Sequence, residues 1–369
     1  MREIIKNTGS VYFSSSKWDI LNTKINDLKP STIFILVDVN TLKYCLAFML
    51  NKLEIKDNYK VLKIQEGEIN KNIKTCEYLW NQLSENSADR QSLLINLGGG
   101  VVTDIGGFVA STFMRGIQFV NVPTTLLAMV DASIGGKNGV DLGIIKNQIG
   151  VINNPVMILI CKEFLNTLPK NQLKAGYAEV IKHGIIDSES YWDKIKIFNE
   201  LNIDEMDAII WESVLVKNNI ITIDPFEKNI RKKLNYGHTL GHAIESYSIG
   251  NHSVPSLLHG EAIAIGMVLT TYISHIQCGF PEETLTEIST YIFNKFKKIE
   301  FNQDDIKHII KLLKHDKKKH DNKVLFVLLN DIGKHQLNIE VPQKMIFEAF
   351  DYYKNIGQGL LRILVLIVN

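Results

Sequence analysis

The amino-acid sequence predicts an α/β domain with a parallel sheet, followed by a mainly α-helical domain. In the first half, short runs of Val, Ile and Leu alternate with helical stretches, whereas helical periodicity dominates after about residue 160. The length of 369 residues also exceeds what one hydrophobic core usually serves. Strands that are almost wholly apolar are typical of a parallel sheet covered by helices on both faces.

The boundary between the two patterns lies near residues 160 to 175, where Pro155 and Pro169 interrupt the chain. We therefore expect an α/β domain over 1–165 and a helical domain over 166–369. The strands expected in the first domain cover 32–40, 61–65, 92–97 and 117–122. The helices expected in the second cover 174–186, 204–221, 236–248, 259–276 and 303–319.

Composition excludes several classes of protein. Lys and Arg number 41 against 40 Asp and Glu, so we expect no sustained field for nucleic acid or an anionic membrane. The N-terminus lacks the apolar stretch of a signal peptide, and no run reaches the roughly 18 to 20 apolar residues that span a bilayer. The four widely spaced cysteines are interpreted as reduced core residues. We expect a cytoplasmic protein without a nucleic-acid or membrane partner.

Glycines follow one predicted strand directly. Gly98, Gly99 and Gly100 come after the strand over 92–97, where backbone N–H groups and a helix N-terminus can meet a pyrophosphate. The spacing is not GxGxxG, so a merely tight strand-to-helix turn is an equal alternative. Asp38 ends the strand over 32–40 and suits either a ribose hydroxyl or a helix cap.

The segment SIGGKNGVDLGIIKNQIG over 133–150 places Lys137 and Lys146 among glycines and polar residues. Point charges beside flexible glycines suit a phosphate or carboxylate ligand. Solvated lysines on a surface loop are the alternative.

The segment LNYGHTLGHAIE over 234–245 contains His238 and His242 one helical turn apart, with Glu245 near the same stripe. The residues between the histidines lack the glutamate of HExxH, and a histidine pair alone is more often packing than a metal site. His259 begins another predicted helix, and Glu179 lies in a third. One Glu and two His from three helices would make a zinc site with open positions. A metal site and packing both remain possible on the residues alone.

Five segments together resemble the 3-dehydroquinate synthase family, from about residue 30 to residue 335. They are GGGVVTDIGGFVASTFMRG, VPTTLLAMVDASIGGKNGVD, AEVIKHG, EKNIRKKLNYGHTLGHAIE and HGEAIAIGM. The resemblance implies a Rossmann-like N-terminal domain that binds NAD, a helical metal-binding domain, and an active site in the cleft between them. A homodimer is common in this family.

The resemblance also implies a reaction of the shikimate pathway. The substrate, 3-deoxy-D-arabino-heptulosonate 7-phosphate, is a phosphorylated seven-carbon sugar acid. A ring hydroxyl is oxidised transiently by NAD, phosphate leaves by β-elimination, the ketone is reduced again, and an intramolecular aldol reaction gives 3-dehydroquinate. The implied cofactors of this carbon–oxygen lyase are NAD and Zn²⁺, for which Co²⁺ can substitute.

The matching motifs assign site residues by resemblance. The implied metal ligands are Glu179, His238 and His259. The implied catalytic residues are Glu227, His242, Lys137 and Asn147. The implied substrate-binding residues are Arg115, Asp131, Lys137, Asn147, Lys182, Lys217, Arg231 and Asn235. The implied NAD-binding residues are Asp38, Asn40, Glu68, Lys71, Gly99, Gly100, Asp104, Thr124, Thr125 and Lys146.

The sequence departs from the family pattern at several positions. Ile145 stands where the family usually has a glycine, and the longer link between His242 and His259 adds His252 as a competing ligand candidate. One lysine of 317–319 is expected to contact substrate, and the apolar end GLLRILVLIVN has no assigned role.

Three other functions compete with this reading. One is a sugar phosphate cyclase acting on sedoheptulose 7-phosphate, which lacks the carboxylate that Arg231 and Asn235 favour. The second is a metal-dependent alcohol dehydrogenase, which would accumulate NADH. The third is a non-catalytic binding protein, which the retained ligand and base positions disfavour.

Overall fold

The computed structural model describes residues 2–6, 9–13, 18–55, 58–143, 145–198, 202–250, 254–313 and 324–356. The chain forms two compact units. Unit 1 comprises Met1–Gly176 and Glu200–Asn218, and unit 2 comprises Tyr177–Asn199 and Asn219–Asn369. Two of the divisions fall inside long helices, α6 (Lys170–Asp187) and α8 (Met206–Ile223). The domain boundary predicted after residue 165, between the α/β part and the helical part of the sequence, stays a prediction.

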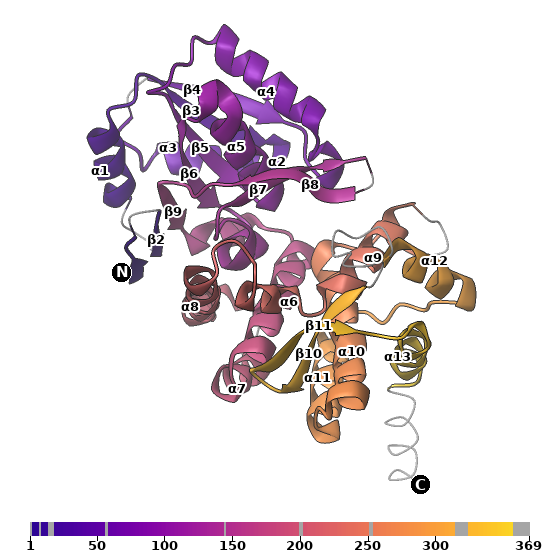
Figure 1. Ribbon diagram of the computed structural model, residues 1–369. Helices are drawn as coiled ribbons and strands as arrows, with labels where there is room; N and C mark the ends of the chain where they lie inside the picture. Colours follow the sequence, from indigo (N-terminus) through magenta and orange to yellow (C-terminus); the bar gives the residue numbers. More distant parts are fainter. Residues whose placement is uncertain are drawn as a thin grey trace. The chain divides into compact units, whose positions relative to one another are not determined.

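Unit 1 contains a seven-stranded sheet in the order β1-β2-β9-β6-β5-β3-β4 (Figure 1). All neighbouring strands are parallel except β1 and β2. The predicted strands correspond to β3, β4, β5 and β6, which are parallel neighbours, so the parallel sheet is confirmed. The strand bounds are β1 Arg2–Ile4, β2 Ser10–Phe13, β3 Ile33–Asp38, β4 Tyr59–Ile64, β5 Leu93–Gly98, β6 Gln118–Pro123 and β9 Met157–Ile160.

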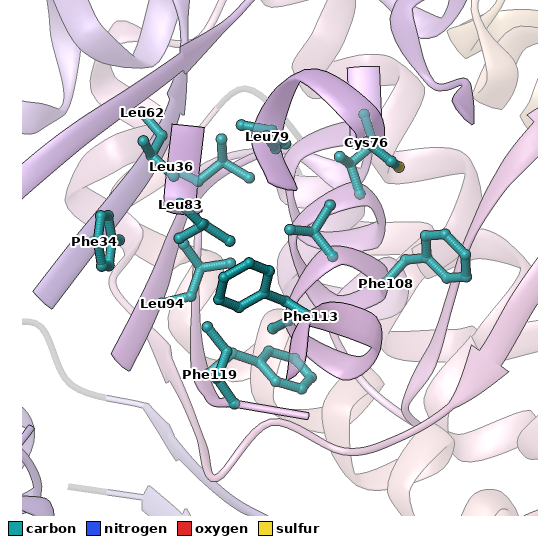
Figure 2. Close-up of a cluster of buried hydrophobic side chains, with 14 of the residues drawn as sticks. Phe34, Leu36, Leu62, Cys76, Leu79, Leu83, Leu94, Phe108, Phe113 and Phe119 are labelled. Carbon is teal, nitrogen blue, oxygen red and sulfur yellow. The ribbon is translucent and has the colours of Figure 1, made fainter. Parts of the chain in front are cut away.

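Helices cover this sheet because their apolar residues face it. Figure 2 shows a core built by side chains from β3, β5, β6, α4 and α5, among which Phe34, Leu83, Leu94 and Phe119 are almost fully buried. Every residue of β5 is buried, as expected for a strand covered on both faces. The helices of unit 1 ahead of α6 are α1 Asp19–Leu28, α2 Val39–Tyr44, α3 Leu46–Leu50, α4 Ile73–Glu85 and α5 Gly100–Thr112.

The segment over 133–150 is not simply a flexible loop. It forms most of an antiparallel hairpin, β7 (Lys137–Leu142) and β8 (Ile145–Ile152), which packs on α5. Along β8, exposed and half-buried residues largely alternate, because one face of the strand remains exposed. Ile145 pairs with Leu142 beside the turn, so the residue that replaces a family glycine begins a strand.

Unit 2 is mainly helical, as predicted. Its central helix is α10, which contacts α9, α11, α13 and β10 and buries most of its residues. A two-stranded hairpin of β10 (Leu325–Asp331) and β11 (Lys334–Glu340) was not expected in this region. The helices of unit 2 beyond α6 and α8 are α7 Glu189–Ile197, α9 His238–Gly250, α10 His259–Cys278, α11 Glu282–Lys295, α12 Gln303–Leu313 and α13 Gln343–Asn355.

Other sequence-based expectations have mixed outcomes. All four cysteines are free thiols, three of them buried and Cys278 half-buried. Within the described part of the chain, no helix has the length and apolarity needed to cross a membrane. His252, the lysines of 317–319 and the apolar end lie outside the described residues.

Candidate active site

Three side chains from three helices of unit 2 converge. Glu179 comes from α6, His238 is the first residue of α9, and His259 is the first residue of α10. Glu179 Oε1 lies 3.4 Å from His238 Nε2 and 3.6 Å from His259 Nε2. Glu179 is fully buried and His238 is 8% exposed. Both imidazoles therefore direct the same ring nitrogen at one carboxylate oxygen.

Each histidine is held through its other ring nitrogen. His238 Nδ1 lies 3.1 Å from the carbonyl oxygen of Tyr236, to which a protonated Nδ1 donates. His259 Nδ1 lies 3.0 Å from Glu245 Oε2. An acceptor at Nδ1 favours the tautomer whose Nε2 lone pair can bind a metal ion, in His238 as a neutral ring and in His259 once its second proton is lost.

Burial and neighbouring charges set the protonation of these groups. Burial alone would raise the pKa of Glu179, but Lys182 and His238 outweigh it and hold that pKa well below its ordinary range. Burial and nearby Lys182 lower the pKa of His238. Burial opposes the charge on His259, but Glu179 and Glu245 raise its pKa to about 10. The three side chains thus offer an anionic carboxylate oxygen, a neutral imidazole in His238 and a protonated imidazole in His259, whose proton a metal ion would have to replace.

The donor set fits a borderline divalent cation. Both carboxylate oxygens of Glu179 are buried, and neither accepts a hydrogen bond from a described residue, although Lys182 forms an ion pair with Oε2. Two imidazole nitrogens and one carboxylate oxygen make a common catalytic zinc site, with positions left for substrate. These residues would hold the zinc that the family resemblance implies.

His242 is close enough to offer a second ligand set. It lies one turn after His238 on α9, with ring centroids 5.1 Å apart. One ligand atom each from His238, His242 and His259 falls within 4.8 Å of the others. Two sets therefore share His238 and His259 and differ in whether Glu179 or His242 is the third ligand. The assignment of Glu179 as ligand and His242 as proton carrier stays a prediction.

Other predicted residues of unit 2 also meet one another. Asn235 Nδ2 donates to Glu227 Oε1 at 2.5 Å, and Glu227 has a left-handed backbone with φ 57°. Arg231 is 2% exposed, and its Nη1 donates to the carbonyl oxygen of Pro225 at 2.5 Å. Asp224 fixes this turn by accepting backbone N–H bonds from three residues, including Arg231. The turn before α9 is therefore rigidly built.

In unit 1, predicted NAD-binding residues gather at the carboxyl ends of adjacent parallel strands. Gly99 is the N-cap of α5, and Thr124 N donates to the carbonyl oxygen of Gly98 across the two strand ends. A Cβ on Gly99 would lie 2.9 Å from Thr125 Cγ2, so only glycine fits there without movement. This edge of a parallel sheet, at a helix N-terminus, is where dinucleotides bind in related folds.

Asp38 ends the neighbouring strand β3 and caps α2, accepting a hydrogen bond from Thr41 N at 2.7 Å. The helix-cap interpretation is therefore confirmed for Asp38, whereas the ribose contact stays a prediction. Asn40, also predicted for NAD, donates to Glu66 Oε2.

Charged residues from distant segments form a second cluster in unit 1. Lys71 Nζ donates to Asp104 Oδ2 at 2.5 Å and to Asn147 Oδ1 at 2.6 Å. Lys146 Nζ lies 3.2 Å from Glu68 Oε1. Burial would lower the pKa of Lys71, but Asp104 and Glu68 outweigh it and raise that pKa. The structure thus brings together five residues that the sequence alone could not connect.

Two further predicted substrate residues pair within unit 1. Lys217 Nζ donates to the carbonyl oxygen of Asp131 at 2.5 Å and to its Oδ1 at 2.7 Å. The segment that contains Asp131 lies beside the α5 N-terminus. A Cβ added to Gly100 there would be only 3.2 Å from Ala132 Cβ.

Arg115 is not brought to this edge of the sheet. It follows the opposite end of α5, whose 13 residues span about 20 Å, and its side chain is exposed with φ 71°. Lys137 is exposed at the first residue of β7. Their substrate contacts stay predictions.

Sequence reasoning assigned no role to two residues that hold predicted site residues. Glu245 was recognised only as a neighbour of the histidine stripe, because its contact with His259 depends on how α9 and α10 pack. Asp141 Oδ1 accepts from Asn147 N at 2.6 Å and so fixes a residue with φ 50°. No local sequence signal identifies that contact.

A seven-stranded α/β unit with a glycine turn, together with a helical unit carrying a convergent Glu and His set, defines a class. It is the class of proteins with the sugar phosphate cyclase fold. Two family models match the chain, 3-dehydroquinate synthase N-terminal over residues 61–175 and 3-dehydroquinate synthase C-terminal over residues 176–319. The chain belongs to the 3-dehydroquinate synthase family.

Relatives and solved structures agree with this placement. The 3-dehydroquinate synthase of Pyrococcus furiosus is 41% identical over 334 residues, which cover 90% of this chain and 95% of that protein. A 2-deoxy-scyllo-inosose synthase complexed with carbaglucose-6-phosphate, NAD+ and Co2+ has a TM-score of 0.81 at 24% identity, covering 92% of this chain and 96% of its own. The 2-epi-5-epi-valiolone synthase ValA of Streptomyces hygroscopicus, with NAD+ and Zn2+ bound, has a TM-score of 0.82 at 21% identity, covering 95% and 98%.

Proposed function

We propose that this protein catalyses the 3-dehydroquinate synthase reaction, in which 3-deoxy-D-arabino-heptulosonate 7-phosphate gives 3-dehydroquinate and inorganic phosphate. The observation that carries the proposal is the convergence of Glu179, His238 and His259 on one point in a chain of this family. Structurally similar proteins with NAD+ and Co2+ or Zn2+ bound support the same cofactors for this chain. The substrate belongs to the class of phosphorylated sugars, of which one analogue is bound in a similar protein.

When bound, zinc supplies a Lewis acid that lowers the pKa of a ring hydroxyl, and NAD supplies a hydride acceptor that is regenerated within the cycle. Glu179, His238 and His259 hold the cation. Lys182, Arg231 and Asn235 of unit 2 orient the anionic and hydroxyl groups of the substrate. In unit 1, the turn at Gly99 and the Lys71 cluster would hold NAD, because backbone N–H groups at the α5 N-terminus suit an anionic diphosphate.

Proton transfers fall to two side chains of unit 2. His242 lies beside the proposed ligands and, as an imidazole, can both accept and donate a proton near pH 7. Glu227 is held by Asn235 in a rigid turn before α9, where a carboxylate can accept a proton. We propose that both act on the substrate while phosphate departs.

The decisive assay follows phosphate and NADH together. With 3-deoxy-D-arabino-heptulosonate 7-phosphate, zinc and NAD well below the substrate concentration, we expect one phosphate for each substrate consumed and no accumulation of absorbance at 340 nm. Dialysis against a chelator should abolish phosphate release, and zinc or cobalt should restore it. Stoichiometric NADH would instead indicate a dehydrogenase.

Sedoheptulose 7-phosphate serves as the comparison substrate because it lacks the carboxylate. We expect far slower turnover of this sugar, since Arg231 and Asn235 would lose the anion they bind. Equal or faster turnover would assign the protein to another sugar phosphate cyclase activity.

A further inference from the structure

Glu245 is a buried acidic residue to which neither sequence nor family resemblance gives a role. It lies in α9, is 4% exposed, and presents Oε2 to His259 Nδ1 at 3.0 Å. Buried carboxylates are uncommon unless a charge or several hydrogen bonds stabilise them. Its contact with an imidazole that faces Glu179 on the opposite side therefore requires an explanation.

The backbone around this contact is fixed from both helices. Ser248 Oγ donates to the carbonyl oxygen of Glu245 at 2.8 Å and accepts from Leu257 N at 3.1 Å, which ties α9 to the segment before α10. Glu261 Oε2 accepts from Leu258 N at 2.8 Å and caps the first turn of α10. His259 begins that turn, so these hydrogen bonds fix its backbone, while Glu245 contacts its ring.

The two proposed metal-binding histidines differ in what holds Nδ1. His238 faces a neutral carbonyl oxygen, whereas His259 faces a carboxylate. An anionic acceptor fixes the tautomer as a carbonyl does, and it also makes the ring a stronger electron-pair donor at Nε2. His259 belongs to both candidate ligand sets, so this argument holds whether Glu179 or His242 is the third ligand.

We infer that Glu245 is a positioning residue for the metal centre, which accepts the Nδ1 proton of His259 and so presents Nε2 to the cation. The inference rests on the proposed function only in requiring that a divalent metal binds His259.

The test measures metal affinity rather than turnover. Metal-free wild type, Glu245→Gln and Glu245→Ala compete with a chromophoric chelator for zinc at constant pH, and cobalt absorption spectra report the ligand field. We expect Glu245→Ala to weaken zinc binding by about 10- to 100-fold, since loss of such a partner typically has that effect. Glu245→Gln should lose less, because its amide oxygen still accepts the hydrogen bond but carries no charge.

The matched control is Asp305→Asn. Asp305 of α12 is equally buried at 4% exposure, and its Oδ1 accepts from Tyr247 Oη of α9 at 2.6 Å. A purely structural role for Glu245 would make its variants behave like this control, with altered unfolding midpoints but unchanged zinc affinity and cobalt spectrum.

The outcomes separate the inference from the proposed function. Wild type that binds one zinc, together with folded Glu245 variants of unchanged affinity, overturns the inference alone. If Glu245→Ala does not fold, the affinity of Glu245→Gln decides in the same way. Wild type that binds no zinc contradicts both the inference and the proposed metal chemistry.

Discussion

His238 and His259 face the same carboxylate oxygen but hold protons differently. The pKa of His238 is lowered by burial and by Lys182, so this ring is neutral near pH 7. Burial also disfavours charge on His259, yet Glu179 and Glu245 raise its pKa to about 10. In the metal-free protein, His259 is therefore the imidazole that carries a proton between two carboxylates.

We predict that zinc binding near pH 7 releases about one proton for each metal bound, because the cation must displace the proton of His259. Since its pKa is raised, apparent affinity should increase about tenfold for each pH unit from 7 towards 9. Titration in weak buffer with a pH indicator measures the release. Zinc binding without proton release would contradict this account of the site.

At the scale of elements, the site depends on how closely α9 and α10 approach. Gly266 of α10 faces the backbone of α9, and a Cβ there would lie 2.1 Å from the carbonyl oxygen of Gly237. It would also lie 2.8 Å from the backbone nitrogen of Gly241. Backbone atoms cannot rotate away, so any larger residue must separate the helices that present His238 and His259.

Gly266→Ala should lower the free energy of unfolding by about 1 to 3 kcal/mol, the usual cost of overpacking. It should also weaken zinc binding, because the two histidines move apart. Urea denaturation and chelator competition measure the two effects. The control Ile276→Ala, at a side chain 49% exposed on the same helix, should change stability by only about 0.5 kcal/mol. Wild-type zinc affinity in Gly266→Ala would show that this close approach is unimportant.

Strands buried on both faces and helices with a regular spacing of residues were predictable from the sequence. Buried strands such as β5 are continuous apolar runs, and the helical spacing of His238 and His242 places them on one face. The hairpins β7–β8 and β10–β11 were missed for a physical reason. The hairpin β7–β8 contains Lys, Asn and Gln at exposed positions, and its glycines are typical of a loop sequence. The pairing of its two strands does not appear in the local periodicity of the sequence.

The same limit applies to the site. Motif resemblance selected Glu179, His238 and His259, which the structure brings together. The contact between Glu245 and His259, and that between Asp141 and Asn147, join segments that only tertiary packing relates. Arg115 lies beyond the C-terminal end of α5, and its substrate contact stays a prediction.

At the scale of the whole molecule, the residues predicted to bind NAD and those predicted to bind the metal belong to different units. All predicted NAD-binding residues belong to unit 1, and all predicted metal ligands belong to unit 2. The near-balance of 41 basic and 40 acidic residues means that attraction for an anionic substrate must come from local groups such as Lys182 and Arg231.

We predict that each ligand protects its own unit from hydrogen exchange. Zinc added to the metal-free protein should slow exchange in α9 and α10, whose ends carry the histidines. NAD should slow exchange around the α5 N-terminus and the end of β3. Mass spectrometry of peptides measures both effects, with magnesium as the control for zinc. Uniform protection of both units by zinc would contradict the assignment of the zinc ligands to unit 2.

The central claim is that one divalent cation is held by Glu179, His238 and His259 while His242 is spared for proton transfer. Elemental analysis of zinc in wild type and in Glu179→Gln, His238→Ala, His259→Ala and His242→Ala tests it most directly. We expect about one zinc per chain in wild type and in His242→Ala, which should nevertheless be inactive, and little zinc in the other three. A His242→Ala protein without zinc, beside a Glu179→Gln protein that retains it, would contradict the claim and assign the metal to three histidines.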